Sequence, residues 1–167
     1  MTPLGHLTRL KQLWLNRNPI TDITSLAELT HLTRLFLIET QVTDVTPLAE
    51  LPQLDELSLM NNQITDVASF ARLTNLQELD LDGNAISDVT SLARLTNLQV
   101  LDLSNNQIVD VTPLGNLTSL KVLSLGNNQI TDATPLGGLT DLLSLSLYGN
   151  LLASRTCPVQ PETICVF

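Results

Sequence analysis

Aromatic side chains and positive charges are scarce in this sequence. Phe, Trp and Tyr make up 3% of its 167 residues, so a core must be filled with aliphatic side chains. Lys and Arg number 8 against 17 Asp and Glu, which leaves a formal net charge of −9. Nucleic acids and anionic membranes bind clustered Lys and Arg. We therefore expect neither as a partner, and expect a protein or peptide with basic groups instead.

Long apolar runs are also missing, although 43% of the residues are hydrophobic. Asn, Asp or Thr interrupts each apolar stretch well before the ~20 residues of a membrane span. Met1 is not followed by the charged and apolar regions of a secretory signal. We therefore predict no membrane insertion, and we favour the cytoplasm while leaving the compartment open.

Cysteine occurs twice, as Cys157 and Cys165, both within the last eleven residues. Two cysteines are too few for a disulfide framework. They could close one small terminal loop, or they could remain as free thiols. The spacing alone does not decide between these alternatives.

Leucine recurs at a constant spacing of 22 residues along almost the whole chain. The positions are Leu10, Leu32, Leu54, Leu76, Leu98, Leu120 and Leu142. From each of them the pattern L-x-x-L-x-L-x-x-N follows, and only Thr40 replaces the asparagine. The alternation around the fourth and sixth positions is the period of a strand. One such unit cannot bury its leucines alone, so the repeat predicts a stacked solenoid.

The predicted fold is an α/β-type repeat solenoid, a curved right-handed coil with a parallel sheet on its concave side. About seven short strands are expected, near 12–15, 34–37, 56–59, 78–81, 100–103, 122–125 and 144–147. After each asparagine, a segment such as 44–48 (Asp-Val-Thr-Pro-Leu) predicts a 3-10 or helical turn on the convex side. We expect the solenoid to span 1–153 and a C-terminal cap to span 154–167.

Two columns of polar residues are assigned to the scaffold. The asparagines are expected to bond the backbone of neighbouring turns, so this ladder should loosen at Thr40. The second column consists of Asp22, Asp44, Asp66, Asp88, Asp110 and Asp132. We expect these aspartates to cap the outer turns. One carboxylate per turn lacks the dense oxygen cluster that calcium needs, so no metal site is predicted.

These motifs resemble the leucine-rich repeat family over about residues 2–153. The 22-residue unit, with I-x-D-[VI]-x-[PS]-L after the asparagine, is similar to the bacterial internalin-like class. The resemblance implies a protein-binding scaffold without naming the partner. The tail is similar to the endings of some cyanobacterial leucine-rich repeat proteins. In it, Val159, Ile164, Val166 and Phe167 are expected to cover the leucines of the last turn.

The outward-facing strand residues carry the information that the scaffold does not require. Trp14, Phe36, Ile38 and Met60 fall side by side on the first three turns, and we call them the apolar patch. Such anchors are typical of a protein interface. The alternative is that they pack against an N-terminal cap absent from this chain.

Acidic residues follow on the middle turns of the same face. Glu56, Glu78, Asp80, Asp82 and Asp102 form what we call the acidic patch, and nothing in the predicted fold requires them there. Three alternatives stay open: a solvated surface, a site for Lys or Arg of a partner, and a divalent ion at Asp80, Asp82 and Asp102. Tyr148 is the one large side chain near the C-terminal end of this face, where it could anchor a peptide.

Catalytic constellations are not found in the sequence. His6 and His31 fall on outer positions, several turns from either cysteine, so no nucleophile–base pair is expected. The glycines belong to turns rather than to a phosphate-binding loop. We therefore predict no catalytic residues and no cofactor.

The chain starts in mid-repeat, since residues 2–8 match residues 112–118. We expect either a fragment of a longer protein or a homodimer through the open first turn. The favoured function is a protein–protein interaction module that uses the apolar patch, the acidic patch and Tyr148. The alternative is a structural or targeting segment of a larger multidomain protein. A regulatory domain of an enzyme is a third hypothesis, which requires a catalytic domain on the same gene.

Overall fold

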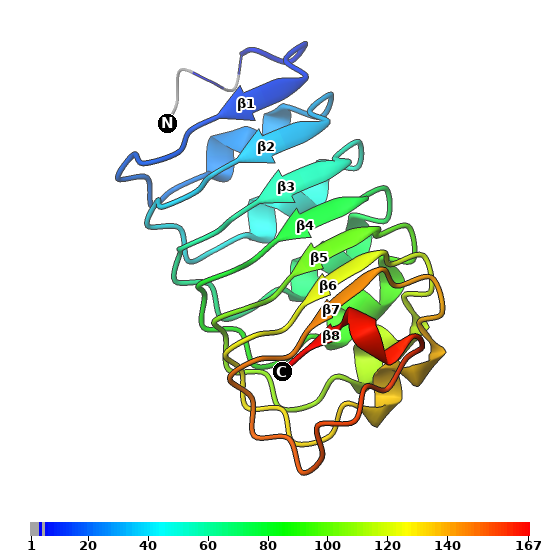
Figure 1. The fold of residues 1–167 in the computed structure, drawn as a ribbon. Helices are drawn as coiled ribbons and strands as arrows, with labels where there is room; N and C mark the ends of the chain where they lie inside the picture. The colour runs from blue at the N-terminus through cyan, green and yellow to red at the C-terminus, as the bar shows by residue number, and fades with distance from the viewer. Residues whose placement is uncertain (1–3, 5) are drawn as a thin grey trace.

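Each 22-residue repeat forms one turn of a coil, and the turns stack with their strands side by side (Figure 1). The computed structural model describes residue 4 and residues 6–167. Residues 1–3 and 5, which contribute to the predicted mid-repeat start, lie outside the described residues. No helix among residues 4 and 6–167 is long and apolar enough to cross a membrane.

The strands form one open parallel sheet in sequence order, which confirms the predicted solenoid. They are β1 (Gln12–Trp14), β2 (Arg34–Phe36), β3 (Glu56–Ser58), β4 (Glu78–Asp80), β5 (Val100–Asp102), β6 (Val122–Ser124), β7 (Ser144–Ser146) and β8 (Cys165–Val166). The register from β1 to β7 pairs residues 22 apart, as in Leu13 with Leu35. The leucine period of the sequence is therefore the pairing register of the sheet.

Two strand predictions need correction. The first seven strands each end one residue earlier than the ranges predicted, although hydrogen bonds between neighbouring turns continue beyond them: the N–H of Leu37 bonds the carbonyl of Ser58 at 2.9 Å. The eighth strand, β8, was not predicted, since the tail carries no repeat period. Its Val166 carbonyl accepts the N–H of Leu147 at 2.7 Å, which extends the sheet by one strand.

The predicted outer turns are 3-10 helices, labelled η here, and they lie on one side of the sheet (Figure 1). They are η1 (Thr24–Glu28), η2 (Thr46–Glu50), η3 (Ala68–Arg72), η4 (Thr90–Arg94), η5 (Thr112–Asn116) and η6 (Thr134–Gly138). A further 3-10 helix, η7 (Glu162–Ile164), lies in the tail directly before β8 and was not predicted. The opposite face of the sheet carries no helix of the described chain, and we call it the open face. A 3-10 turn is narrower than an α-helical turn, which suits a repeat of this length.

The core is a continuous stack of aliphatic side chains between the sheet and the 3-10 helices. Strand leucines such as Leu57, Leu79 and Leu101 are at most 1% exposed. Phe70 of η3 is the single aromatic side chain among the buried residues, where the other turns place leucine. The first turn is less covered, because Leu10 and its neighbours are only partly buried. Stacking on both sides is therefore what buries each repeat.

The asparagine ladder is present as predicted, and Asn106 shows its geometry. Its side-chain Nδ2 donates to the carbonyls of Leu81, Leu103 and Ser104 at 3.0, 3.1 and 3.0 Å. Its Oδ1 accepts the N–H of Ile86 at 2.9 Å. The same bonds to the preceding turn recur at Asn62, Asn84, Asn128 and Asn150. Each amide thus joins two turns.

Thr40 interrupts this ladder. Its hydroxyl donates within its own turn, to the carbonyl of Leu37 at 3.1 Å, and contacts Oδ1 of Asn62 at 2.6 Å. The N–H of Ile20, which an asparagine at position 40 would accept, bonds the carbonyl of Asn18 instead. The first and second turns therefore lack the amide connection that joins the later turns.

The aspartate column caps the 3-10 helices, as predicted. Each carboxylate accepts the N–H of the residue two positions later, for example Asp88 from Thr90 at 2.8 Å. The same bond occurs at Asp22, Asp44, Asp66, Asp110 and Asp132. Hydrogen bonds from the threonine two residues later hold the pKa below its ordinary value in Asp22, Asp44, Asp88, Asp110 and Asp132. These carboxylates stabilise the fold in their charged form.

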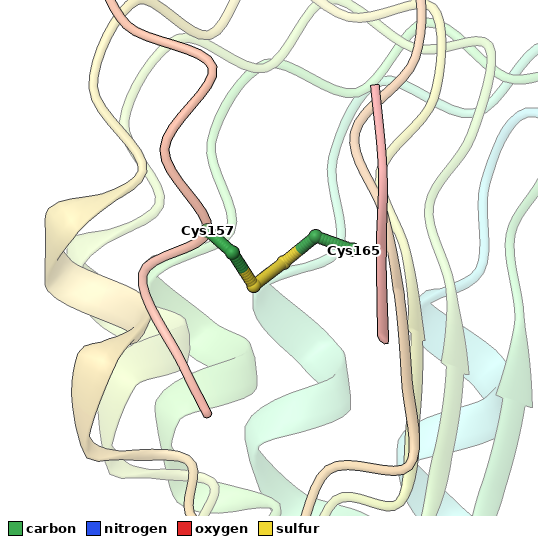
Figure 2. Close-up of a disulfide and its surroundings, with 2 residues drawn as sticks. All are labelled: Cys157 and Cys165. Atoms are coloured by element: carbon green, nitrogen blue, oxygen red, sulfur yellow. A yellow bond between two sulfur atoms is a disulfide. The ribbon is translucent and has the colours of Figure 1, made fainter. Parts of the chain in front are cut away.

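The tail packs against the last turn and is joined to itself by a disulfide between Cys157 and Cys165, with a Cα–Cα distance of 5.7 Å (Figure 2). Cys157 and Val159 are buried, and Phe167 packs against the core. Val166 was expected to cover the leucines of the last turn, and this is wrong, since it is 54% exposed. It alternates outward from the neighbouring Cys165 along β8.

Candidate protein-binding surface

The apolar patch lies at the start of the open face. Trp14 of β1 and Phe36 of β2 are opposite each other in the parallel register, and their rings stack with centroids 5.5 Å apart and planes inclined by 2°. Trp14 is 57% exposed, whereas Phe36, Ile38 and Met60 are half-buried. The patch therefore presents one protruding ring, supported from one side by a second ring.

A hollow of 240 Å³ opens beside this pair on the open face. It is lined by Phe36, Ile38, Glu56, Leu57, Ser58, Glu78, Leu79, Asp80, Val100 and Asp102. The structure thus brings together six of the ten residues predicted for binding, one pair of them apolar and four acidic. Trp14, Met60, Asp82 and Tyr148 do not line the hollow. Val100 was not among the predicted residues, although it belongs to the same repeat column as Glu56 and Glu78.

The acidic residues of the hollow differ in their partners. Glu56 forms a salt bridge with Arg34 of the preceding turn, at 3.2 Å from Nε. Glu78, Asp80 and Asp102 have no salt bridge to any Lys, Arg or His within the described chain. Within the acidic patch, Glu56 is therefore already paired, because Arg34 lies directly beside it in the parallel register.

Asp80 and Asp102 also have a local role that the sequence analysis did not anticipate. Their Oδ1 atoms accept the N–H groups of Asp82 and Ser104 at 3.1 and 2.8 Å, where the chain leaves the strand. Oδ2 of Asp80 accepts the hydroxyl of Ser58 at 2.8 Å. Burial raises the pKa of Asp80 despite these two bonds, which lower it, and the repulsion of Asp102 and Asp82 adds a smaller upward shift. The fold thus uses two carboxylates that were expected to have no structural role.

Asp82 lies in the turn after β4 rather than in the hollow. Its Oδ1 accepts Nδ2 of Asn105 at 2.6 Å, a contact between neighbouring turns. No group of three or more His, Cys, Asp or Glu side chains that could hold a metal ion occurs within residues 4 and 6–167.

Tyr148 lies at the other end of the open face and is 41% exposed. Its ring covers Gly126 so closely that a Cβ atom on that glycine would collide with ring atoms. Gly126 is buried for this reason, and Ser104 in the same column is buried too. Small residues in this column therefore lie beneath the surface although they belong to the outward-facing positions.

A second hollow, of 550 Å³, lies along the edge where the strands begin, and its lining is polar: Thr33, Gln53, Asp55, Asn75, Gln77, Asn97 and Gln99. Amide side chains connect successive turns here, since Nε2 of Gln99 donates to Oε1 of Gln77 at 3.3 Å. Lys121 donates in turn to Oε1 of Gln99 at 3.1 Å. This edge was not predicted, although the sequence carries a signal for it: a column of polar residues just before the strands, such as Thr33, Asp55 and Gln77.

Comparison with known proteins adds the family context. The family model for Leucine Rich repeats (2 copies) matches residues 8–50, 30–72, 52–94, 74–116, 96–138 and 118–154. No curated protein matches the chain.

Among solved structures, the chain is similar to an internalin, inlF, of Listeria monocytogenes, with a TM-score of 0.90 and 41% identity. The match covers 92% of this chain and 46% of the internalin, so the chain spans less than half of that relative. Internalin C2 of the same organism has a TM-score of 0.75 and 33% identity, over 98% of this chain and 82% of its own. A plant peptide hormone receptor, RGFR1, solved in complex with RGF2, has a TM-score of 0.77 and 29% identity, over 88% of this chain and 26% of its own.

Proposed function

Since the chain belongs to the leucine-rich repeat family, and within it to the bacterial internalin-like class, we propose that it binds a protein or peptide on its open face. Leucine-rich repeat folds are generally protein–protein interaction modules. The observation that carries the proposal for this chain is the hollow beside the stacked Trp14–Phe36 pair. It joins an aromatic anchor to uncompensated carboxylates on the open face of the sheet, where the described chain places no helix.

The chemistry of the face favours a partner with apolar and basic groups. Trp14 supplies a large rigid ring to an interface at low entropic cost. Glu78, Asp80 and Asp102 add negative potential to a chain whose net charge is already −9. The plant receptor was solved in complex with RGF2, and we propose the same kind of partner, a protein or peptide, for this chain. Leucine-rich repeat proteins are typically not enzymes, and we propose that this chain is not one either.

Substitution of the anchor tests the proposal. The purified chain is immobilised, and proteins are captured from extracts of the source organism and of candidate hosts. Trp14→Ala together with Phe36→Ala should abolish capture of the specific partner while the melting temperature stays almost unchanged. Leu143→Ala is the matched control, because Leu143 is a 70% exposed apolar side chain just before β7. Capture that survives the double substitution contradicts the proposal, as does capture that Leu143→Ala weakens equally.

A structural or targeting segment of a larger protein is the second candidate. It is favoured by the first turn, where Leu10, Leu13 and Leu15 are only partly buried while their counterparts in the next turn are 0% exposed. A neighbouring domain or a second copy of the chain could cover this end. Light scattering of the isolated chain measures its oligomeric state and so tests the homodimer. A monomer at all concentrations excludes the homodimer. A concentration-dependent dimer that is lost in Leu13→Asp supports it.

The disulfide bears on the compartment. Disulfides persist in oxidising compartments and are rare in the cytosol, so we propose an oxidising compartment in place of the cytoplasm favoured by the sequence. Alkylation of the unreduced protein followed by mass spectrometry should label neither Cys157 nor Cys165. Labelling of both cysteines in protein isolated from its native source would contradict this proposal.

A further inference from the structure

The hollow on the open face has apolar walls and an uneven distribution of charge. Phe36, Ile38 and Val100 contribute these walls, and the hollow lies over the strands at Leu57 and Leu79, whose own side chains are buried in the core. Its space exists because Ser58, beside Phe36 in the same column, carries a small and buried side chain. A narrow site of this kind fits a long side chain with an apolar stem and a polar end.

Phe36 offers one ring face to that space. Its other face is occupied, because the ring of Trp14 stacks on it from the β1 side with an interplanar angle of 2°. The remaining face is turned toward β3, where the hollow begins. An aromatic face next to carboxylates favours the binding of a cation, since both the ring quadrupole and the negative charges attract it.

Three of the four carboxylates around the hollow are free to receive that cation. Glu56 is already paired with Arg34. Asp80 and Asp102 each have one oxygen held by a backbone N–H, at 3.1 and 2.8 Å, which fixes the orientation of the carboxylates. The second oxygen of Asp80 accepts the Ser58 hydroxyl at 2.8 Å, and a carboxylate oxygen can accept a further hydrogen bond beside it. No salt bridge neutralises Glu78, Asp80 or Asp102 within the described chain, although Asp80 and Asp102 are half-buried. Half-buried carboxylates without a cation gain more from a partner's charge than exposed ones do.

We infer that this hollow is a subsite for an arginine side chain of the bound protein or peptide. The guanidinium stacks on the free face of Phe36 and donates to Asp80 and Asp102, and its stem packs along Ile38 and Val100. Arginine fits better than lysine, because its planar group both stacks on an aromatic ring and donates to carboxylates as a fork. The inference rests on the proposed function and specifies what that function recognises.

Small probes test the subsite without knowledge of the partner. The ¹⁵N-labelled chain is titrated with acetyl-arginine amide, acetyl-lysine amide and acetyl-citrulline amide, and the backbone signals near Phe36, Asp80 and Asp102 are followed by NMR. We expect saturable shifts with arginine, binding weaker by roughly threefold or more with lysine, and no saturable shift with the uncharged citrulline. Equal affinity for lysine, or equal affinity for citrulline, overturns the inference. So does the absence of any saturable shift with arginine.

Two variants assign the binding to the named groups. Asp102→Asn keeps the acceptor for the N–H of Ser104 and removes the charge, so arginine affinity should fall by about three- to tenfold. Asp141→Asn removes the same charge at an exposed position before β7 and should change the affinity by less than about twofold. Phe36→Leu keeps an apolar wall without a ring, so the preference for arginine over lysine should become smaller, because only the forked donation to the carboxylates still favours arginine. Circular dichroism melting verifies that each variant is folded.

The outcomes separate this inference from the proposed function. A chain that captures its partner through Trp14 but shows no preference for arginine overturns the inference alone. A chain that binds arginine in the hollow while partner capture ignores Trp14 and Phe36 contradicts the proposed function. An effect of Asp141→Asn as large as that of Asp102→Asn would show that net charge, rather than the hollow, determines binding, and would overturn the inference.

Discussion

Replacement of Asn106 by alanine should cost a large part of the stability of the molecule. The side chain is 8% exposed and connects the turns of β4 and β5. Its two N–H groups serve three carbonyls, and its oxygen accepts the N–H of Ile86, so about three hydrogen bonds are lost. At about 1 kcal/mol net for each bond, with a further ~1–3 kcal/mol for buried groups left without partners, we expect a loss of about 4–6 kcal/mol. Small proteins have only about 5–15 kcal/mol in total.

The measurement is equilibrium unfolding in urea, followed by circular dichroism. Asn97→Ala is the matched control, because Asn97 is exposed and makes one bond of the same kind, from Nδ2 to the carbonyl of Thr74 at 2.9 Å. We expect that control to cost at most about 1 kcal/mol. The midpoint for Asn106→Ala should fall well below that of the control. If both variants unfold at the same urea concentration, the amide ladder does not stabilise the coil and the reasoning is refuted.

Three further predictions concern stability. Thr40→Asn should raise the melting temperature and slow amide hydrogen exchange at Ile20, because it supplies the missing connection between the first two turns; unchanged exchange at Ile20 would contradict this. The aspartate caps have folded-state pKa values below their unfolded values, so their stabilisation is present above about pH 4 and is lost as the pH falls through the lowered values. Asp88→Asn removes one of these carboxylates, so urea unfolding should show a smaller loss of stability in acid for this variant. Asp80→Asn should stabilise the chain at pH 7, because the pKa of Asp80 is raised and its charged form is disfavoured; the gain should vanish below the unfolded pKa of about 3.9, and a gain that persists at pH 3 would disprove the explanation.

The fold was predictable because the length of the repeat determines which residues pair between neighbouring strands. Leucines 22 residues apart had to stack, and the structure pairs them in that register from β1 to β7. The asparagine and aspartate columns were predictable for the same reason, since each repeats a local contact. Strand β8 was not predictable, because the tail has no period. The place of Cys165 in the sheet became known only from its pairing with Leu145 of β7 in the structure.

The sequence predicted which residues of the candidate site lie near one another, but it did not predict the hollow that they line. The columns placed Phe36, Glu78 and Asp102 near one another, and the structure does so in the hollow. The salt bridge between Arg34 and Glu56 was predictable by the same reasoning, because the two residues lie 22 residues apart in the same column. The depth of the hollow was beyond sequence reasoning, because it depends on how far Ser58 lies beneath the larger side chains beside it.

The constant 22-residue register has a consequence for how this molecule can change over generations. A gene that loses or duplicates one whole repeat still encodes turns whose leucines and asparagines meet equivalent neighbours, because each turn contacts only the adjacent ones. The number of repeats outside the hollow can therefore change independently of those that form it. Strands β2 to β5 form the hollow, and β6 and β7 carry none of it. Recombination between repeats could lengthen the coil or move the hollow along it without a new fold having to arise.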